Sequence, residues 1–354
     1  MNFTYWVTED CNLKCSYCYV NKVPKTMDQE TAARAIEFTE KILAANPARQ
    51  KDKLCISLHG GEPLLNYPVI RYIIEAFQSK YPGNTAFTMT TNGTTPNGTT
   101  PNNEILDYLA SHVELTVSVD GNQESHDRNR VYGNGQGSFR RVMKTIEYLN
   151  SKSYFYRVRM TITPNNVSDF ADNYIYLYEK GCKIVAFALD ESDPDWNKEL
   201  MDIYQRNLYN IFTYMISRDL TNAQYCLHNF KNEYFRRRST CDGCHTSYNI
   251  ASDGSIYPCI LAVGHGDFVM GNVHTGLNEA KLAELDTINQ KDEGACSTCA
   301  MYSNCRSKTC KIINKIQTGN YYMSSPIFCT AQKIHYSTVK NLDYILDGFA
   351  VSAK

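Results

Sequence analysis

The feature that most constrains the fold is an alternation of strand-like and helix-like segments over the first half of the chain. The strand-like segments lie at 2–8, 53–58, 85–90, 113–119, 154–162 and 183–189. Between them apolar residues recur at helical spacing, as in Phe139, Val142, Ile146 and Leu149. Parallel strands joined by helices have right-handed crossovers. The pattern therefore predicts an α/β fold, a partial parallel (β/α)6 barrel with functional groups at the carboxyl ends of its strands.

The rest of the pattern divides the chain into regions. The barrel is expected at 1–190, a linker with bridging helices at 191–240, a cysteine-rich domain at 241–329 and a C-terminal helix in 330–354. Within these regions, helices are predicted at about 198–218 and 331–346.

Two features inside the barrel carry separate predictions. The segment 184–189 is apolar on both faces, which predicts a strand covered on both sides of a parallel sheet. The sequence GTTPN occurs at 93–97 and again at 98–102, which predicts a flexible loop extension after the third strand.

Charge and hydropathy exclude several classes of protein. The chain has 36 basic and 37 acidic residues, so it lacks the basic surface of a nucleic-acid-binding protein. No apolar stretch approaches the roughly 20 residues that a membrane helix needs. The N-terminus reads as a strand and not as a signal peptide. We therefore expect a cytoplasmic protein that binds neither nucleic acid nor a membrane.

Fourteen cysteines make metal binding the first chemistry to consider. The cytoplasm keeps thiols reduced, so clustered cysteines there indicate metal sites rather than disulfides. Cys11, Cys15 and Cys18 follow the first strand, at the mouth of the predicted barrel. Three thiolates bind three irons of a [4Fe–4S] cluster and leave the fourth iron open to a ligand. A structural zinc site is the alternative, although zinc ordinarily takes four protein ligands there.

A second motif ends the second strand at the same mouth of the barrel. It reads Leu-His-Gly-Gly-Glu-Pro and contains Gly60, Gly61 and Glu62. Glycines let a ligand approach the backbone closely, and a carboxylate can bind an ammonium group. Taken alone, the motif would be better explained as a tight turn with a surface glutamate.

Together these motifs resemble those of the radical S-adenosylmethionine (SAM) enzymes, whose C-x3-C-x-aromatic-C motif matches Cys11, Cys15, Tyr17 and Cys18. The resemblance implies that SAM chelates the open iron and that the three cysteines, as catalytic residues, support its cleavage to a hydrogen-abstracting 5′-deoxyadenosyl radical. It also implies cofactor contacts around the adenine, at the amino group and at the strand ends. These contacts are expected at Tyr17, Gly60, Gly61, Glu62, Asn92, Ser118 and Asp120.

The later cysteines resemble the SPASM extension of peptide-modifying radical SAM enzymes, although their C-x2-C pairs alone would also fit zinc ribbons. The resemblance implies two auxiliary [4Fe–4S] clusters, and three clusters in all with the catalytic one. The farther auxiliary cluster would use Cys296, Cys299, Cys305 and Cys329. The nearer one would use Cys244, Cys259 and Cys310, the last of which departs by one residue from the usual spacing.

Three further cysteines need separate interpretations. Cys241 lies outside the family pattern but forms a C-x2-C pair with Cys244, so we expect it to be the fourth ligand of the nearer cluster. A free thiol at Cys241 is the alternative. Cys55 and Cys182 lie in or beside apolar strands and are expected to be packing residues.

The resemblance implies a maturase that forms a thioether crosslink, from a cysteine sulfur to a carbon, in a ribosomally made precursor peptide. A low-potential donor such as flavodoxin or ferredoxin would supply electrons. The alternative is an anaerobic sulfatase-maturating enzyme, which makes formylglycine. Those relatives carry an aspartate base directly after the cysteine that matches Cys259, where this chain has Ile260. An alternative of another class is a non-catalytic zinc or electron-transfer module.

Recognition of a peptide leader is the last expectation. The chain starts ten residues before Cys11, which leaves no room there for the small leader-binding domain of some peptide maturases. We expect leader recognition by the barrel and the later segments, or by a separate leader-binding protein.

Overall fold

The computed structural model describes residues 1–49, 52–95 and 100–345. These residues form two compact units. The first unit contains residues 1–160, 181–187 and 242–285, and the second contains 161–180, 188–241 and the described residues from 286 onward. The domain boundaries expected from the sequence remain predictions.

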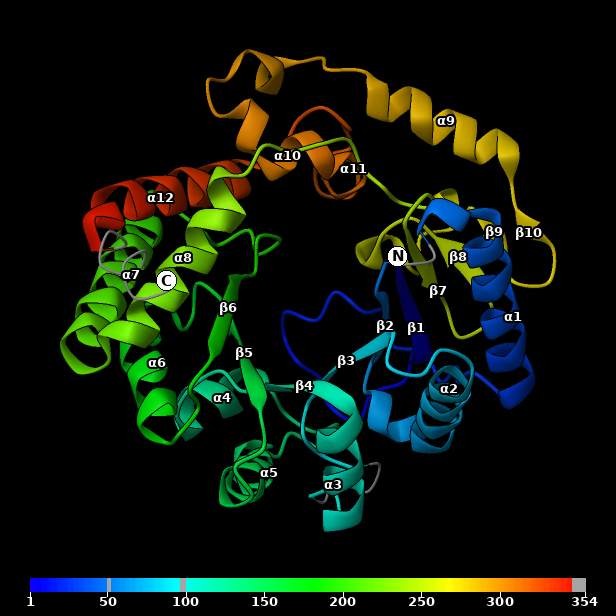
Figure 1. Ribbon diagram of the computed structural model, residues 1–354. Helices are drawn as coiled ribbons and strands as arrows, with labels where there is room; N and C mark the ends of the chain where they lie inside the picture. The colour runs from blue at the N-terminus through cyan, green and yellow to red at the C-terminus, as the bar shows by residue number, and fades with distance from the viewer. Residues whose placement is uncertain (50–51, 96–99, 346–354) are drawn as a thin grey trace. The chain divides into compact units, whose positions relative to one another are not determined.

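Ten strands form one sheet, and its first half is the parallel arrangement that the sequence predicts (Figure 1). Neighbouring strands from β1 to β5 pair in parallel and in chain order, and β6 follows at the end of the sheet. These strands are β1 (Asn2–Thr8), β2 (Leu54–Gly60), β3 (Thr85–Thr91), β4 (Val113–Ser118), β5 (Tyr156–Ile162) and β6 (Val185–Leu189). The predicted α/β fold class is confirmed.

The sheet continues on the other side of β1 with strands from much later in the chain. A parallel strand pairs with β1, and three short antiparallel strands follow it. These are β7 (Ser247–Ile250), β8 (Ser255–Tyr257), β9 (Gly271–Asn272) and β10 (Gly276–Leu277). Strand β1 therefore lies between the barrel strands and the hairpin that leads to Cys259.

Five helices of the first unit connect the barrel strands: α1 (Gln29–Ala45), α2 (Tyr67–Lys80), α3 (Asn103–His112), α4 (Gln123–Asn129) and α5 (Phe139–Ser151). Helix α1 begins where the Asp28 carboxylate accepts the Thr31 N–H, at 2.7 Å. Its Ala35 and Ile36 are buried, and the Tyr5 hydroxyl of β1 donates to the Ala35 carbonyl at 3.1 Å. The apolar sides of helix and strand thus form one core.

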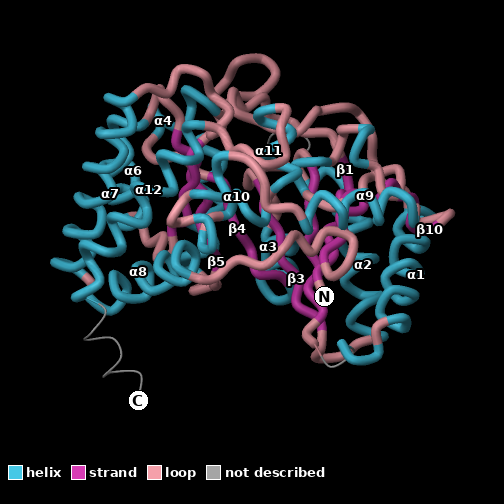
Figure 2. The backbone as a smooth tube through the Cα atoms, turned by 90° about the horizontal axis from the view of Figure 1, so that it is seen from above, coloured by secondary structure: helices cyan, strands magenta, loops and turns pink. Residues whose placement is uncertain are grey.

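Helices dominate the second unit. Four of them pack together, as Figures 1 and 2 show: α6 (Phe170–Glu179), α7 (Lys198–Arg218), α8 (Leu220–Phe235) and α12 (Pro326–Leu342). Phe212, Leu227 and Val339 form the centre of their core. The other helical segments from residue 279 on are α9 (Glu279–Gln290), η6 (Ala295–Thr298), η7 (Tyr302–Asn304), α10 (Arg306–Thr309), α11 (Lys311–Thr318) and η8 (Asp343–Ile345).

The structure corrects two predictions. The strand predicted at 184–189 is not a fully buried interior strand: it is the last strand of the sheet, and Ala186 to Leu189 are only half-buried. The C-terminal helix begins at Pro326 and not near 331, because the Ser325 hydroxyl accepts the Phe328 N–H at 3.2 Å and proline suits the first helical turn. Part of the duplicated GTTPN loop, residues 96–99, lies outside the described residues.

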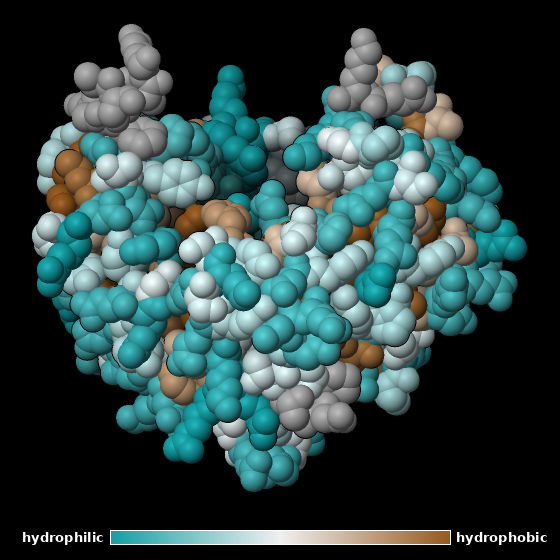
Figure 3. Space-filling model, turned by 60° about the horizontal axis from the view of Figure 1, so that its bottom comes forward, coloured by the Kyte–Doolittle hydropathy of each residue, from teal (hydrophilic) through white to brown (hydrophobic). Residues whose placement is uncertain are grey.

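No helix within 1–49, 52–95 and 100–345 is both long and apolar enough to cross a membrane. On the face of the molecule shown in Figure 3, hydrophilic side chains dominate and apolar ones are scattered among them.

Candidate functional site

The three cysteines that follow β1 are half-buried and lie close enough to interact electrostatically. Burial, with smaller contributions from Glu62 and Cys15, raises the pKa of Cys11 to about 12. Burial also raises the pKa of Cys15, and the nearby Cys18 contributes to that rise. A bound metal deprotonates a coordinating thiol outright. Three half-buried thiols in one loop, with Cys15 close to both Cys11 and Cys18, are therefore a donor set that fits an iron–sulfur cluster.

As the side chains stand, no group of three or more His, Cys, Asp or Glu among the described residues could hold a metal ion. In a [4Fe–4S] cluster each cysteine binds a different iron. The contacts that hold the cysteine loop in place come from the ends of β2, β3 and β4.

Two glycines at the end of β2 let the cysteine loop lie directly against that strand. A Cβ atom on Gly61 would lie 2.3 Å from the Asp10 carbonyl oxygen and 2.9 Å from the Cys11 Cβ. Gly60 has a φ of +157°, and a Cβ there would lie 2.2 Å from the Thr8 oxygen. Any side chain at Gly61 would displace the loop that carries Cys11.

Glu62 is a buried carboxylate, 1% exposed, with three protein donors. Its Oε1 accepts from the Leu64 N–H at 3.0 Å and the Thr91 hydroxyl at 2.7 Å, and its Oε2 accepts from the Asn92 N–H at 2.6 Å. Burial raises the pKa of Glu62 to about 7, although these hydrogen bonds act to lower it. A carboxylate has about four lone-pair sites, so Glu62 keeps acceptor capacity for a ligand ammonium.

The Asn92 side chain, at the end of β3, orients the cysteine loop. Its Nδ2 donates to the Asn12 Oδ1 at 2.8 Å and lies 3.9 Å from the Cys11 sulfur. Its Oδ1 accepts from both the backbone N–H and the hydroxyl of Thr94, at 2.9 and 2.7 Å. Asn12 in turn donates to the Thr95 carbonyl at 2.7 Å. Sequence analysis missed Asn12 and Thr94, which stand next to the predicted Cys11 and near the predicted Asn92.

Asp120 follows β4, two residues after the predicted contact Ser118, and forms a buried ion pair with Arg130. The two bonds of this pair, from Arg130 Nε and Nη2, are 2.9 and 3.1 Å long, and the side chains are 0% and 7% exposed. The Tyr17 hydroxyl also donates to Asp120. The Arg130 guanidinium lies 5.2 Å from the centre of the Tyr17 ring. The pair therefore fixes the aromatic residue of the cysteine motif.

Arg130 was missed by sequence analysis, because no local motif connects it to Asp120.

A buried histidine supports the same region. His126 Nδ1 accepts the Asp120 N–H at 3.4 Å, and His126 Nε2 lies 2.9 Å from the Ser138 hydroxyl. Burial lowers the pKa of His126 to about 3, so the ring is neutral at pH 7.

Two of the later cysteines belong to the first unit. Cys259 follows β8, and while burial raises the pKa of this thiol, the backbone N–H groups of residues 260–262 lower it. Cys244 has a φ of 60°, unusual for a residue other than glycine. The Ser252 hydroxyl donates to the Glu9 carboxylate at 2.6 Å, so the hairpin is fastened to the chain just before Cys11.

The second unit gathers four of the other predicted ligands. Cys305 is electrostatically close to Cys296, Cys329 and Cys299, each of which raises its pKa beyond the larger effect of burial. The Ser307 N–H lies 3.4 Å from the Cys305 sulfur. The structure thus brings together the four cysteines expected at the farther auxiliary cluster. Cys241 and Cys310 also lie in the second unit, whereas Cys244 and Cys259 lie in the first.

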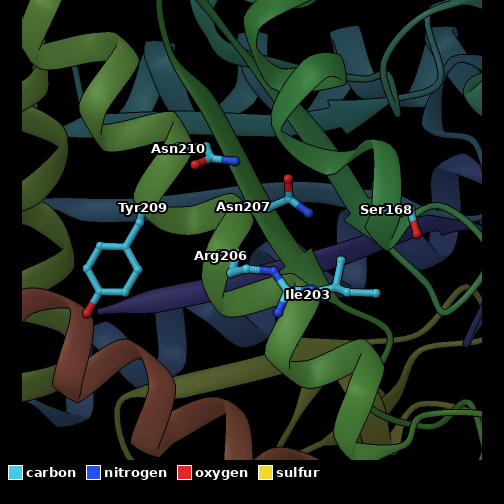
Figure 4. A pocket seen from close by; sticks show the side chains of 6 residues that line it. All are labelled: Ser168, Ile203, Arg206, Asn207, Tyr209 and Asn210. Atoms are coloured by element: carbon cyan, nitrogen blue, oxygen red, sulfur yellow. The ribbon is translucent and has the colours of Figure 1, made fainter.

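One surface cavity of about 460 Å³ opens in the second unit. It is lined from η3 (Val167–Asp169) and α7 by Ser168, Ile203, Arg206, Asn207, Tyr209 and Asn210 (Figure 4). Asn207 is fixed by its bond to the Val167 carbonyl, at 2.8 Å, while Arg206 and Asn210 are exposed. None of these residues was predicted to bind a cofactor.

Comparison with known proteins bears on the whole chain. Residues 6–177 match the family model described as the Radical SAM superfamily. The radical SAM cyclopropyl synthase TigE of Paramaledivibacter caminithermalis is 22% identical over 350 residues, which cover 90% of this chain and 69% of TigE. A cysteine-type anaerobic sulfatase-maturating enzyme of Clostridium novyi is 25% identical over 379 residues, which cover 97% of this chain and 96% of that enzyme.

A solved structure has the same fold. The structure described as native anSMEcpe with bound AdoMet and Cp18Cys peptide superposes with a TM-score of 0.76 at 19% identity, covering 100% of this chain and 99% of that one. The family-model match confirms the expected family resemblance, and this structure confirms the fold class.

Proposed function

We propose that this chain, whose residues 6–177 match the Radical SAM superfamily, matures a ribosomally made precursor peptide by forming a thioether crosslink. One observation carries this proposal: Cys305 lies electrostatically close to Cys296, Cys299 and Cys329 in the second unit. A second set of gathered cysteines beyond the radical SAM domain supports an enzyme that must dispose of electrons.

The first cysteine set would hold the catalytic [4Fe–4S] cluster with SAM at its open iron. When bound, the catalytic cluster and SAM together would supply a 5′-deoxyadenosyl radical that abstracts hydrogen. Glu62 would accept a hydrogen bond from the ammonium group of SAM, because one acceptor position of its carboxylate is left over. Asp120 and Arg130 would hold the Tyr17 ring in place beside the cofactor.

The electron balance of the reaction explains why further clusters are needed. Joining a thiol to a carbon that carried hydrogen removes two hydrogen atoms from the peptide. One leaves as a hydrogen atom to the deoxyadenosyl radical, and the other leaves as a proton and an electron. Auxiliary clusters, held by the later cysteines, would supply the acceptor for that electron. Their proposed ligands are Cys241, Cys244, Cys259 and Cys310 for one cluster and Cys296, Cys299, Cys305 and Cys329 for the other.

A second candidate function is sulfatase maturation, which the full-length similarity to the Clostridium novyi enzyme favours. Against it stands Ile260, which occupies the position after Cys259 where the resemblance places an aspartate base. An aliphatic side chain cannot accept a proton. The backbone N–H groups of residues 260–262 point to a role in stabilising the Cys259 sulfur. We therefore rank peptide crosslinking first.

The remaining partners follow from the same proposal. A low-potential donor, flavodoxin or ferredoxin, would reduce the catalytic cluster in the cytoplasm. The peptide leader would be bound by the barrel and later segments or by a separate leader-binding protein.

The experiment that separates the two functions uses anaerobically reconstituted enzyme, SAM, a reductant and two kinds of peptide. Peptides encoded beside the gene should lose two hydrogen atoms by mass spectrometry, together with one alkylatable thiol. A sulfatase peptide should not yield an aldehyde that reacts with a hydrazide probe. Cys15→Ala protein is the control for both peptides. Aldehyde formation without peptide crosslinking would reverse the ranking.

A further inference from the structure

One cation in the second unit lies among the proposed auxiliary ligands. Arg306 directly follows Cys305 and opens α10. Its carbonyl accepts the Cys310 N–H at 2.7 Å. Its guanidinium lies 5.2 Å from the centre of the Phe328 ring, and Phe328 precedes Cys329. Arg306 therefore adjoins cysteines assigned to both auxiliary clusters.

The Arg306 guanidinium is only partly satisfied by the protein. Its Nη2 lies 3.3 Å from Oε1 of Glu191, and the side chain of Arg306 is 36% exposed whereas that of Glu191 is 18% exposed. Its Nε is buried and has no hydrogen-bond partner among the described residues. A buried charged donor without an acceptor is costly, and such groups are rare in folded proteins. The free Nε–H suits an acceptor that arrives with the cofactor.

The side chain of Arg306 is charged, because an arginine guanidinium is not deprotonated in proteins. The neighbouring His335 is neutral, because burial and the Arg306 charge lower its pKa to about 3. Arg306 thus contributes a permanent positive charge next to Cys305 and Cys310.

We propose that Arg306 raises the reduction potential of the auxiliary clusters, so that they accept the electron released on crosslinking. Reduction adds negative charge to a cluster, and a nearby cation or N–H donor favours the reduced form. Glu191 positions the guanidinium and offsets part of its charge. This inference rests on the auxiliary clusters of the proposed function.

The test measures midpoint potentials by paramagnetic resonance in the full chain with Cys15→Ala, so that only auxiliary signals remain. Arg306→Gln should make at least one cluster about tenfold harder to reduce, which is about 59 mV for one electron. Arg306→Lys keeps the charge and should shift the potential less. Lys315→Gln removes an exposed charge from α11 and should leave the potentials unchanged.

A second variant keeps the test decisive if Arg306→Gln does not bind its clusters. Glu191→Gln leaves the guanidinium uncompensated, so the potential should move in the positive direction. Loaded clusters with wild-type potentials in both variants would overturn the inference and leave the proposed function standing. Wild-type protein without auxiliary iron would overturn both.

Discussion

The two cysteine regions are built differently. Around the Cys11–Cys18 loop, buried polar groups from three strand ends hold the chain in place. The Glu62 carboxylate accepts from Leu64, Thr91 and Asn92, and the Asp120 carboxylate accepts from Tyr17 and Arg130. In the second unit, Cys296 lies within the short 3-10 turn η6, the exposed Cys299 directly follows that turn, and Cys305 directly follows η7.

This difference fits a division of labour. A radical that must abstract one particular hydrogen requires the cofactor and substrate to be held in a near-attack geometry. A group that only carries electrons needs no such orientation, and its protein environment chiefly sets its potential. The first region is therefore interpreted as the site of chemistry and the second as the electron outlet.

Cys15→Ala is the variant with the largest expected effect on the first region. We expect it to abolish 5′-deoxyadenosine formation, because two thiolates will not hold the catalytic cluster. Chromatographic detection of deoxyadenosine in reconstituted protein measures this. Cys55→Ala, which changes a half-buried cysteine of β2, is the matched control and should cleave SAM at the wild-type rate. Equal rates in both variants would refute the assignment of the first region.

The next variant acts on the second region. Cys299→Ala should leave deoxyadenosine formation measurable but stop crosslinking, because the first unit keeps its ligands while the electron acceptor is lost. Both products are measured in the same reaction. Ser297→Ala alters an exposed hydroxyl in the same segment and should behave as wild type. Crosslinked peptide at normal yield from folded Cys299→Ala protein would contradict the outlet role.

A stability measurement sharpens the description of the first region. Asp120→Asn leaves the Arg130 guanidinium buried without its carboxylate, so the free energy of unfolding should fall by about 3–5 kcal/mol. The exposed pair of Glu124 with Arg128 supplies the control, and Glu124→Gln should cost less than about 1 kcal/mol. Urea unfolding of both variants measures these two losses in the free energy of unfolding. Similar losses would mean that the buried network does not stabilise the site.

The smallest expected effect is a pH dependence in the second unit. The Nε2 of His335 lies 2.6 Å from the Tyr204 hydroxyl, and its pKa of about 3 keeps the folded ring neutral. In the unfolded chain the ring protonates near pH 6.5. Unfolding then binds a proton, so stability is full above pH 6.5 and declines as the pH falls towards 3, by at most about 1.4 kcal/mol per unit.

His335→Gln is the variant that tests this, because it removes the titrating group. The pH dependence of urea unfolding between pH 6.5 and 4 should be shallower in the variant than in wild type. Parallel curves would exclude His335 as the source.

Local sequence patterns predicted the strands and loops of this molecule better than they predicted its long-range contacts. Strand β1 was expected at its observed bounds, and the cysteine and glycine motifs mark loop positions through spacing alone. The Asp120–Arg130 pair could not be predicted, since an ion pair across a loop leaves no periodic signal. The Asn12–Asn92 bond joins residues 80 positions apart and is equally invisible to a sequence pattern.

The second region shows the same limit. The family resemblance implied a common set of Cys296, Cys299, Cys305 and Cys329, and the structure places the other three close enough to Cys305 to interact electrostatically with it. Their ligation of one cluster remains a prediction. Ligation of the nearer cluster by Cys241 and Cys310 remains a prediction.

Iron and acid-labile sulfide analysis of reconstituted protein tests the central claim most directly, namely that the first region holds one cluster and the later cysteines hold two more. The account predicts about twelve irons per wild-type chain, since each [4Fe–4S] cluster contributes four. It predicts about eight in Cys15→Ala protein, because the auxiliary clusters remain. About four irons in the wild type and none in Cys15→Ala would contradict it, because the later cysteines would then hold no iron.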